Sequence, residues 1–250
     1  MNLLRKAAPA AGSLLMMLVL VAACDRDELR GDIRLSHPFT ENDPRHKWAM
    51  FVAERMAERT GGEVAIRIFP NQQLFKGRQQ YEGLRTNRID LAIYPMPWLS
   101  GRVPAANIGA LPGVIGSLEE GLAWRERRVW DLLAESVERA DVHMASILWV
   151  PATYAGRESV PRLPNNLSGI SMRGMGAPLE TLLAANGASI SSMPAADTYF
   201  GLQTGSLDVL FSTVSSFLGY SMQEVVREIV VGRSFLAGGH FVLMSRGLRQ

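Results

Sequence analysis

The stretch LSGISMRGMGAPLETLLAANGASISSMPAADTYFGLQTGSLD, residues 167–208, is the most informative part of this chain. Its opening run has the pattern of a short strand that ends at Arg173, directly before a Gly-rich turn. Two helix–strand units follow, punctuated by Gly187 and Gly205. Strands that alternate with helices in this way are typical of an α/β fold with mostly parallel sheets.

Arg173 is the first candidate for chemistry. The planar guanidinium of an arginine can donate to both oxygens of a carboxylate, and its charge is not lost by deprotonation. Ile170 and Met172 alternate with Ser171 and Arg173, so the strand has one apolar and one polar face. A charge at this place needs a partner, either an acid of the protein or a ligand. The pattern alone does not separate these two interpretations.

The composition is that of an ordinary globular protein. Its 250 residues can form one large or two modest domains, and 47% hydrophobic with 20% charged residues can build a full core. Arg5 and Lys6 account for the net charge of +2, because the first 23 residues contain no acid and the remainder is balanced. A neutral chain without basic clusters argues against nucleic-acid binding.

The first 23 residues have the features of a signal peptide, with a positive start and an apolar core that is short for a membrane span. The segment Val21-Ala22-Ala23-Cys24 resembles the lipobox of bacterial lipoproteins, in which the cysteine is acylated. We expect lipidation of Cys24, with simple cleavage as the alternative, and a tether over residues 24–31. Asp25 resembles the signal that retains some lipoproteins at the inner membrane, so the lipid anchor would be the chain's membrane contact.

Residue periodicity divides the rest of the chain into strands and helices. Asp43 and Pro44 begin one helix, and Ser117 with Glu120 forms a capping box that opens a long one. The buried stripe expected for this long helix comprises Leu122, Val129, Leu133 and Val137. Expected strands cover residues 33–35, 63–69, 90–94, 142–150, 169–173, 188–191, 207–211 and 240–244, and further helices cover 78–85, 178–185, 196–204 and 222–227. The proline-rich segment 151–166 is the best candidate for a crossover between two lobes.

Other chemistries have little support. The four histidines are scattered without metal-ligand spacing, so no metal is expected. The sequence has no phosphate-binding loop, no dinucleotide fingerprint and no nucleophile elbow. No residue is nominated as catalytic, and we expect neither an enzyme nor a cofactor.

Several segments resemble, in the right order, the substrate-binding receptors of tripartite ATP-independent periplasmic (TRAP) transporters. The matching segments are TGGEV at 60–64, FPNQQL at 69–74, NRID at 87–90, LP at 111–112, LSGISMR at 167–173 and LQTGSLD at 202–208, the last preceded by Tyr199. They span most of the chain after the signal peptide. Asn87 and Phe75 stand where the family commonly has glycine.

The resemblance implies a two-lobed periplasmic binding protein fold with a hinge between the lobes. Lobe 1 would cover residues 32–150, lobe 2 residues 151–239, and a truncated return strand to lobe 1 residues 240–250. The implied function is an extracytoplasmic receptor that binds a small organic acid and delivers it to the membrane subunits of a TRAP permease. The implied location is the periplasm.

The resemblance also implies the binding residues. Arg173 would pair with the ligand carboxylate, and Arg157 resembles a second arginine that often assists. After Asp208 the chain reads VLFST instead of the family's usual glycine and acidic residue, so Ser212 or Thr213 would donate a hydrogen bond instead. Aromatic residues expected to line the pocket are Trp149, Tyr154 and Tyr94. For Arg157, the alternative is a solvated loop cation.

Two other functions remain open at this point. One is a ligand-sensing lipoprotein without a transport role. The other is a truncated, non-functional remnant, because family members continue with helices that cross both lobes whereas this chain ends at Gln250. A fragment, a frameshifted reading and a reduced variant are the three interpretations of that end.

Overall fold

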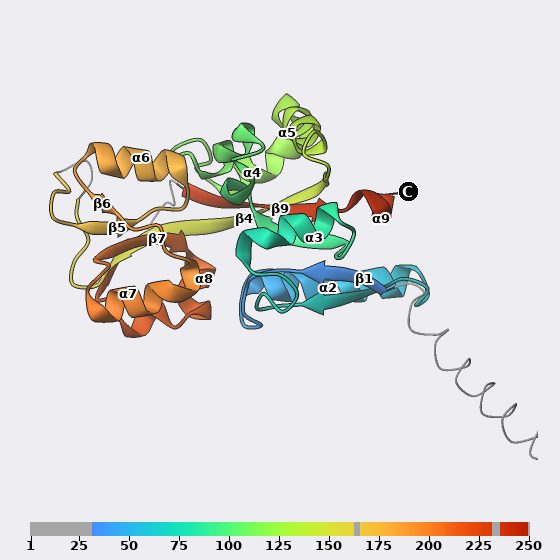
Figure 1. Cartoon of the computed structure of the whole chain (residues 1–250), viewed down its shortest axis with the longest axis horizontal. Coiled ribbons are helices and arrows are strands. Elements are labelled where there is room, and N and C mark those ends of the chain that lie inside the picture. The colour runs from blue at the N-terminus through green and yellow to red at the C-terminus, as the bar shows by residue number, and fades with distance from the viewer. Residues whose placement is uncertain (1–31, 163–165, 232–235, 250) are drawn as a thin grey trace, which may run out of the picture.

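The computed structural model describes residues 32–162, 166–231 and 236–249. The expected signal peptide, the tether and Cys24 lie outside them. One nine-stranded sheet runs through the molecule in the order β2-β1-β3-β9-β4-β7-β5-β6, with β8 paired to β4 (Figure 1). The strands are β1 (Asp32–Ser36), β2 (Ala65–Phe69), β3 (Leu91–Pro95), β4 (His143–Gly156), β5 (Ser171–Arg173), β6 (Ser189–Ile190), β7 (Val209–Thr213), β8 (Glu228–Ile229) and β9 (Leu236–Met244).

The sheet has two lobes that share two long strands. Strands β1, β2 and β3 form the outer part of lobe 1 by parallel pairing, and β5, β6 and β7 form that of lobe 2 in the same way. Strands β4 and β9 pair antiparallel along the middle and join the lobes. The α/β two-lobed expectation is confirmed, with a sheet more mixed than the mostly parallel one expected.

Helices cover both faces of the sheet (Figure 1). In lobe 2, α6 packs on one face with Met172 and Phe211, while α7 and α8 pack on the other with Leu210. The helices are α2 (Pro44–Arg59), α3 (Gln80–Arg85), α4 (Leu118–Ala123), α5 (Arg128–Glu138), α6 (Ala177–Ala185), α7 (Thr198–Thr204), α8 (Val214–Gly219) and α9 (Arg246–Arg249). None of the helices within the described residues is long and apolar enough to cross a membrane.

Both expected helix starts are confirmed. The Asp43 carboxylate accepts a hydrogen bond from the backbone N–H of Arg45 at 2.9 Å and caps α2, with Pro44 in the first turn. The Ser117 hydroxyl accepts from the N–H of Glu120 at 3.2 Å and caps α4.

The single long helix expected after Ser117 is wrong. The chain forms α4, a short 3-10 turn and then α5, because Arg127 has an extended backbone that interrupts the helix. The interruption lets Trp124 pack edge-on against Trp149, with ring centroids 4.9 Å apart. Leu122 consequently leaves the expected buried stripe and is 68% exposed, while Leu133 and Val137 are buried as expected.

The crossover expected at residues 151–166 begins later than predicted. Strand β4 continues through Pro151 to Gly156, so the boundaries expected at 150/151 and 239/240 both fall within shared strands. Pro151 pairs with β9 only, one residue before the pairing with β7 begins, and a strand tolerates proline at such an edge position.

The helix expected at residues 222–227 is also wrong. Only Met222–Glu224 forms a 3-10 turn, after which Glu228 and Ile229 pair with β4. Helix α8 was not predicted from the sequence, because its six residues VSSFLG include two serines and a glycine with low helix propensity. Helix α8 begins directly after β7.

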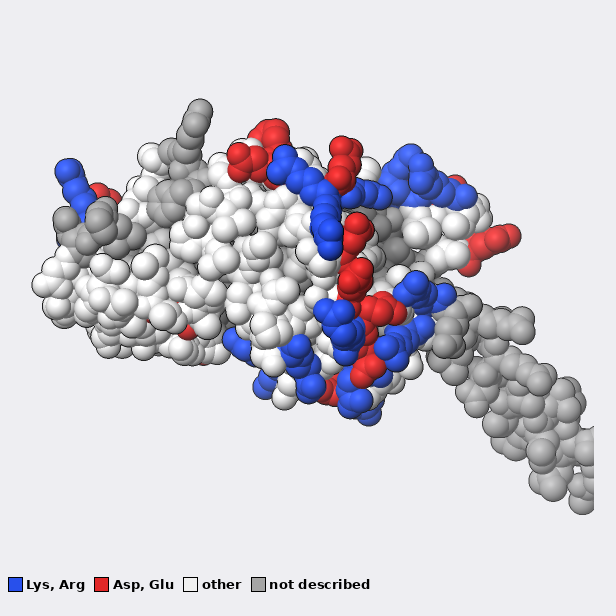
Figure 2. All heavy atoms as spheres, turned by 90° about the horizontal axis from the view of Figure 1, so that it is seen from above, with Lys and Arg blue, Asp and Glu red and all other residues white. Residues whose placement is uncertain are grey.

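Charged side chains are unevenly distributed over the surface. In the view from above, lysine, arginine and acidic residues gather over lobe 1 with both signs interspersed, whereas the surface of lobe 2 is mostly uncharged (Figure 2).

Candidate functional site

Arg173 lies at the end of β5, inside the sheet of lobe 2, because β7 and β6 flank that strand. Its Nε donates to the carbonyl oxygen of Met193 at 3.0 Å, and its Nη1 donates to the carbonyl oxygen of Phe211 at 3.2 Å. These bonds orient the plane of the guanidinium. In the described part of the chain, its other N–H groups have no hydrogen-bond acceptor.

Within the part of the chain that the structure describes, the charge of Arg173 has no carboxylate partner in direct contact. Among residues 32–162, 166–231 and 236–249, no acid forms an ion pair with it. The residue as a whole is half-buried, whereas its guanidinium is densely surrounded by protein. Burial lowers the pKa of Arg173 from its usual value, against the weaker attraction of Glu180 and Tyr220, but arginine stays protonated. A buried cation in this situation favours an anionic ligand.

Hydroxyl groups gather at the end of the neighbouring strand. The Thr213 hydroxyl lies 3.1 Å from that of Ser215 and 2.8 Å from that of Ser216, all on β7 and the first turn of α8. Ser212 is buried beside them on β7. The two hydroxyl residues expected to bind a ligand therefore lie on the strand that borders β5.

Tyr154 lies on the next strand over. It pairs with Phe211 in the β4–β7 register, and the two rings stack with centroids 4.8 Å apart. Tyr154 and Phe211 both belong to the core under α6. The structure therefore places Arg173, Tyr154, Ser212 and Thr213 on three adjacent strands of lobe 2. Tyr154, however, packs with Met172 on the α6 face of the sheet, which is opposite to the face of Arg173.

Trp149 and Tyr94 lie in lobe 1 instead. Trp149 packs against Trp124, and a Cβ added to Gly121 would lie 2.7 Å from its ring. Tyr94 is 1% exposed, and its hydroxyl donates to the carbonyl oxygen of Arg78 at 3.1 Å. Both side chains are part of the packing of the lobe 1 core.

Arg157 directly follows the end of β4. Its backbone N–H donates to the carbonyl oxygen of Asp208 at 2.8 Å, before β7 begins. A Cβ added to Gly205 would lie 3.1 Å from its Nη1, so the guanidinium rests on the turn after α7. The Arg173 guanidinium thus bonds β7 at Phe211, the residue before Ser212, whereas Arg157 lies beside Asp208, before β7 begins.

A second buried arginine was not anticipated from the sequence. Arg45 is 3% exposed, and its Nε and Nη2 donate to the two oxygens of Asp43 at 2.8 and 2.5 Å. Its Nη1 lies 2.8 Å from Nε2 of His240, and its guanidinium stacks 3.5 Å above the ring of Phe39. Arg45 and His240 are 195 positions apart, so no local pattern could have revealed the contact.

The hydrogen bonds of this cluster fix the form of His240. Arginine can only donate, so Nε2 accepts from Arg45 and Nδ1 carries the proton that is donated to the carbonyl oxygen of Gly238 at 3.0 Å. Burial, and then the positive charge of Arg45, lower the pKa of His240 to about 3. His240 is therefore neutral at ordinary pH.

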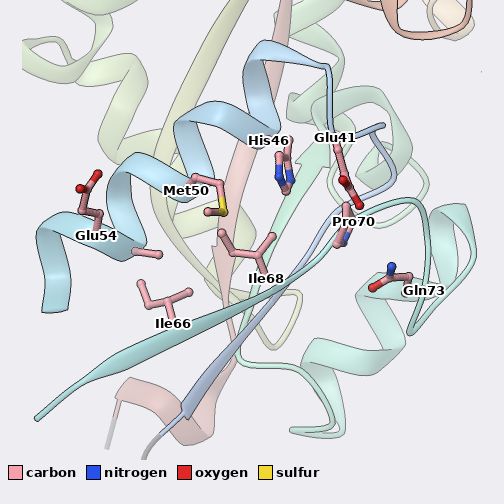
Figure 3. A pocket seen from close by; sticks show the side chains of 9 residues that line it. Glu41, His46, Met50, Glu54, Ile66, Ile68, Pro70 and Gln73 are labelled. Carbon is pink, nitrogen blue, oxygen red and sulfur yellow. The ribbon is translucent and has the colours of Figure 1, made fainter. Parts of the chain in front are cut away.

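A shallow hollow of about 750 Å³ lies elsewhere, between α2 and β2 on lobe 1 (Figure 3). Glu41 and Glu54 lie at its rim, beside Met50, Ile66 and Ile68. An acidic rim over an apolar floor does not suit an organic acid, because its carboxylate would face like charges. The hollow contains none of the expected site residues.

No group of three or more potential metal-ligating side chains occurs within the described residues. Two lobes are joined by two shared strands, and a buried cation at the strand ends of one lobe has no acid partner among the described residues. This arrangement is that of a two-lobed solute-binding protein.

Residues 35–246 match the model of the family described as bacterial extracellular solute-binding protein, family 7, and the chain belongs to this family. A solute-binding protein of Albidiferax ferrireducens is 27% identical over 207 residues, which cover 81% of this chain and 61% of that protein. The 2,3-diketo-L-gulonate-binding periplasmic protein of Escherichia coli is 23% identical over 180 residues, covering 70% of this chain and 54% of that protein.

Solved structures of TRAP solute-binding proteins have the same fold as this chain. A TRAP periplasmic solute binding protein from Rhodoferax ferrireducens with bound malonate superimposes with a TM-score of 0.81 at 25% identity. The match covers 86% of this chain and 70% of that one. The alignments with the two curated relatives span only 54 to 61% of their length.

Proposed function

We propose that this chain is an extracytoplasmic receptor that binds a small organic acid between its lobes and delivers it to a TRAP-type membrane permease. The observation that carries the proposal is Arg173, a buried guanidinium held by two backbone carbonyls and by no acid of the described residues. The family membership and the malonate bound by the similar receptor from Rhodoferax ferrireducens support it.

The mechanism follows from the position of the site. A ligand carboxylate accepts hydrogen bonds from the N–H groups of Arg173 that the protein leaves open, and such charge-assisted pairs are strong when water is excluded. Ser212 and Thr213 on the adjoining strand are suited to a second polar group of the ligand. Closure of the lobes around the acid would mark the loaded state for the permease.

The proposal places the receptor in the periplasm. The finer assignment, a lipid anchor on Cys24 that holds it at the inner membrane, rests on the sequence alone, because Cys24 lies outside the described residues. Binding would require no catalytic step, cofactor or metal.

Thermal denaturation with a panel of organic acids tests the binding role. A binding acid raises the melting temperature, because it binds the folded state only. Arg173→Ala should abolish the rise, since losing a charge-assisted pair costs about 1.5–3 kcal/mol, or roughly 10- to 150-fold in affinity.

Arg157→Ala is the matched control, because it removes the same kind of side chain from the turn after α7, next to Gly205. We expect it to keep the wild-type response. If Arg173→Ala responds like the wild type, the anchor is assigned wrongly. If Arg157→Ala also loses the response, Arg157 contributes to the site.

A further inference from the structure

Three polar side chains lie in a row on one face of the lobe 2 sheet. Arg173 pairs with Leu210 in the β5–β7 register, and Ser212 follows Leu210 by two residues, so all three side chains lie on the same face. Thr153 of β4 pairs with Ser212 and continues the row onto the third strand. Across these strands the row contains one cation and two neutral hydroxyls.

The hydroxyl of Thr153 has already used its proton, because it donates to the carbonyl oxygen of Val230 at 2.7 Å. Its oxygen is left as an acceptor. A hydroxyl or an amide of a ligand can donate to such an oxygen, whereas a carboxylate cannot donate. This end of the row therefore suits a neutral donor and not a second carboxylate.

Lobe 1 contributes a second guanidinium to this region, but its own chain neutralises the charge. Nη2 of Arg45 donates to the hydroxyl of Ser216 on α8, the helix that follows β7, at 3.0 Å. Nε and Nη2 of the same guanidinium donate to the two oxygens of Asp43. Both members of the pair are buried. The pair therefore adds no net charge where the two lobes meet.

The phenol of Tyr220, just after α8, is within electrostatic reach of both guanidinium groups. Burial raises the pKa of Tyr220, so the phenol is neutral, and the charges of Arg45, Asp43 and Arg173 act on it. His240, beside Arg45, is neutral as well, because burial lowers its pKa to about 3. Within the described part of the chain, two positive charges and one negative charge thus act at Tyr220, which leaves one positive charge.

Glu180 does not supply a further positive charge but opposes the one that is present. It attracts Arg173 weakly from α6, the helix that packs with Met172 on the opposite face of the sheet. An acid in this position lowers the positive potential around Arg173. It therefore favours a ligand with a single negative charge.

We propose that the site selects monocarboxylates over dicarboxylates, with the carboxylate on Arg173 and a neutral hydroxyl or amide of the ligand at Ser212 and Thr153. This inference rests on the proposed function and names the class of acid that the receptor binds. A dicarboxylate would bring its second carboxylate between the lobes without a cation to pair with it. Burying an unpaired charge is costly, whereas a neutral polar group needs only hydrogen bonds.

The first experiment compares acids of equal shape and different charge by calorimetry at neutral pH. Malonate is paired with malonamate, succinate with succinamate and glutarate with glutaramate, so that each pair differs by one carboxylate replaced by a carboxamide. If another acid stabilises the chain more, it is compared with the analogue of equal length that has one carboxylate more or fewer. The member with one carboxylate should bind about 10-fold more tightly or better.

The outcomes separate this inference from the proposed function. A dicarboxylate that binds as tightly as its partner, or more tightly, overturns the selection but leaves a receptor for organic acids. If no acid of either kind binds, the proposed function fails and the selection fails with it. Arg173→Ala should abolish the binding of both members of a pair, because both use the same guanidinium.

The second experiment adds a cation to the site. Asp43→Asn keeps a residue that caps helices well and removes the negative charge beside Arg45, so the Arg45 guanidinium becomes a second cation near Ser216. The ratio of the two affinities in a pair should move toward the dicarboxylate by about 10-fold. Thermal denaturation without ligand shows that the variant is folded, and the wild-type comparison decides the selection if it is not.

Asp90→Asn is the matched control, because it is the same substitution and releases the charge of Arg34 instead. Asp90 precedes β3 at Leu91, whereas the Arg45 cluster lies at the other end of that strand, where Pro95 pairs with His240. The ratio of the two affinities should not change in this variant. An equal shift in both variants, or no shift in folded Asp43→Asn, contradicts the proposed charge balance of the site.

Discussion

Arg45 and Arg173 are both enclosed by the protein, but their surroundings differ. Arg45 has a carboxylate, an imidazole, a hydroxyl and an aromatic ring around its guanidinium. Arg173 has two backbone carbonyls and, within the described residues, no acid in contact. One arginine is neutralised by its own chain, and the other keeps a charge that a ligand can neutralise.

This difference separates a structural cation from a binding cation. Burying a charge is costly unless it is paired, so a buried arginine without an acid is expected where the missing partner comes from outside. The pairing of Arg45 with Asp43 also removes Arg45 as a rival for the ligand carboxylate, although the two guanidinium groups lie near the same tyrosine.

The largest expected effect is on stability. Arg45→Met should lower the free energy of unfolding by about 3–5 kcal/mol, because it leaves the Asp43 carboxylate buried without a counter-charge. Arg173→Met should cost only about 1–2 kcal/mol, because it removes two hydrogen bonds and strands no charge. Urea denaturation of both variants measures the difference. Equal losses would show that the two arginines are not distinguished by their partners.

A partly exposed ion pair provides the control for Arg45. Arg34 donates to Asp90 at 2.8 Å, but the Arg34 side chain is 41% exposed. Asp90→Asn should therefore cost about 1 kcal/mol or less, because solvent screens the pair. A loss as large as that of Arg45→Met would mean that burial is not what makes the Asp43 pair important.

A smaller effect is expected from pH. Burial is the main cause that lowers the pKa of His240 from 6.5 to about 3 and that of His37 from 6.5 to about 4. Below pH 6.5 the unfolded chain binds protons at these residues while the folded chain does not, so stability falls as the pH falls. The expected slope is about 1.4 kcal/mol per pH unit for each histidine.

Urea denaturation between pH 7 and pH 4.5 measures this slope. His240→Gln should remove about half of the slope that the two histidines contribute, because glutamine does not titrate and His37 remains. A slope that does not change in this variant would mean that His240 is not held neutral in the folded chain.

Much of the fold was predictable because its signals are local. The cap at Asp43, the alternation that buries Met172 beside Arg173, and the helices around Gly187 and Gly205 all depend on residues a few positions apart. The break at Arg127 was not predictable, because it depends on Trp124 meeting Trp149 from a different element. The course of β4 through Pro151 depends likewise on which strands lie beside it.

The candidate site was predictable in part. Arg173 was singled out by its place at a strand end and by a family resemblance, and the structure adds that it has no acid partner among the described residues. The cluster around Arg45 could not be found in this way, because Ser216 and His240 lie 171 and 195 positions away from it. Asp43 was correctly identified as a cap, but its buried ion pair with Arg45 was not, because the burial of the pair depends on the folded chain.

The central claim is that Arg173 anchors the carboxylate of an organic acid. A crystal structure of the chain with the acid that stabilises it most tests this directly. The account predicts carboxylate oxygens about 3 Å from the Arg173 guanidinium, with Arg45 still paired to Asp43. A carboxylate bound to Arg45 or Arg157, with Arg173 contacting only Met193 and Phe211, would contradict it.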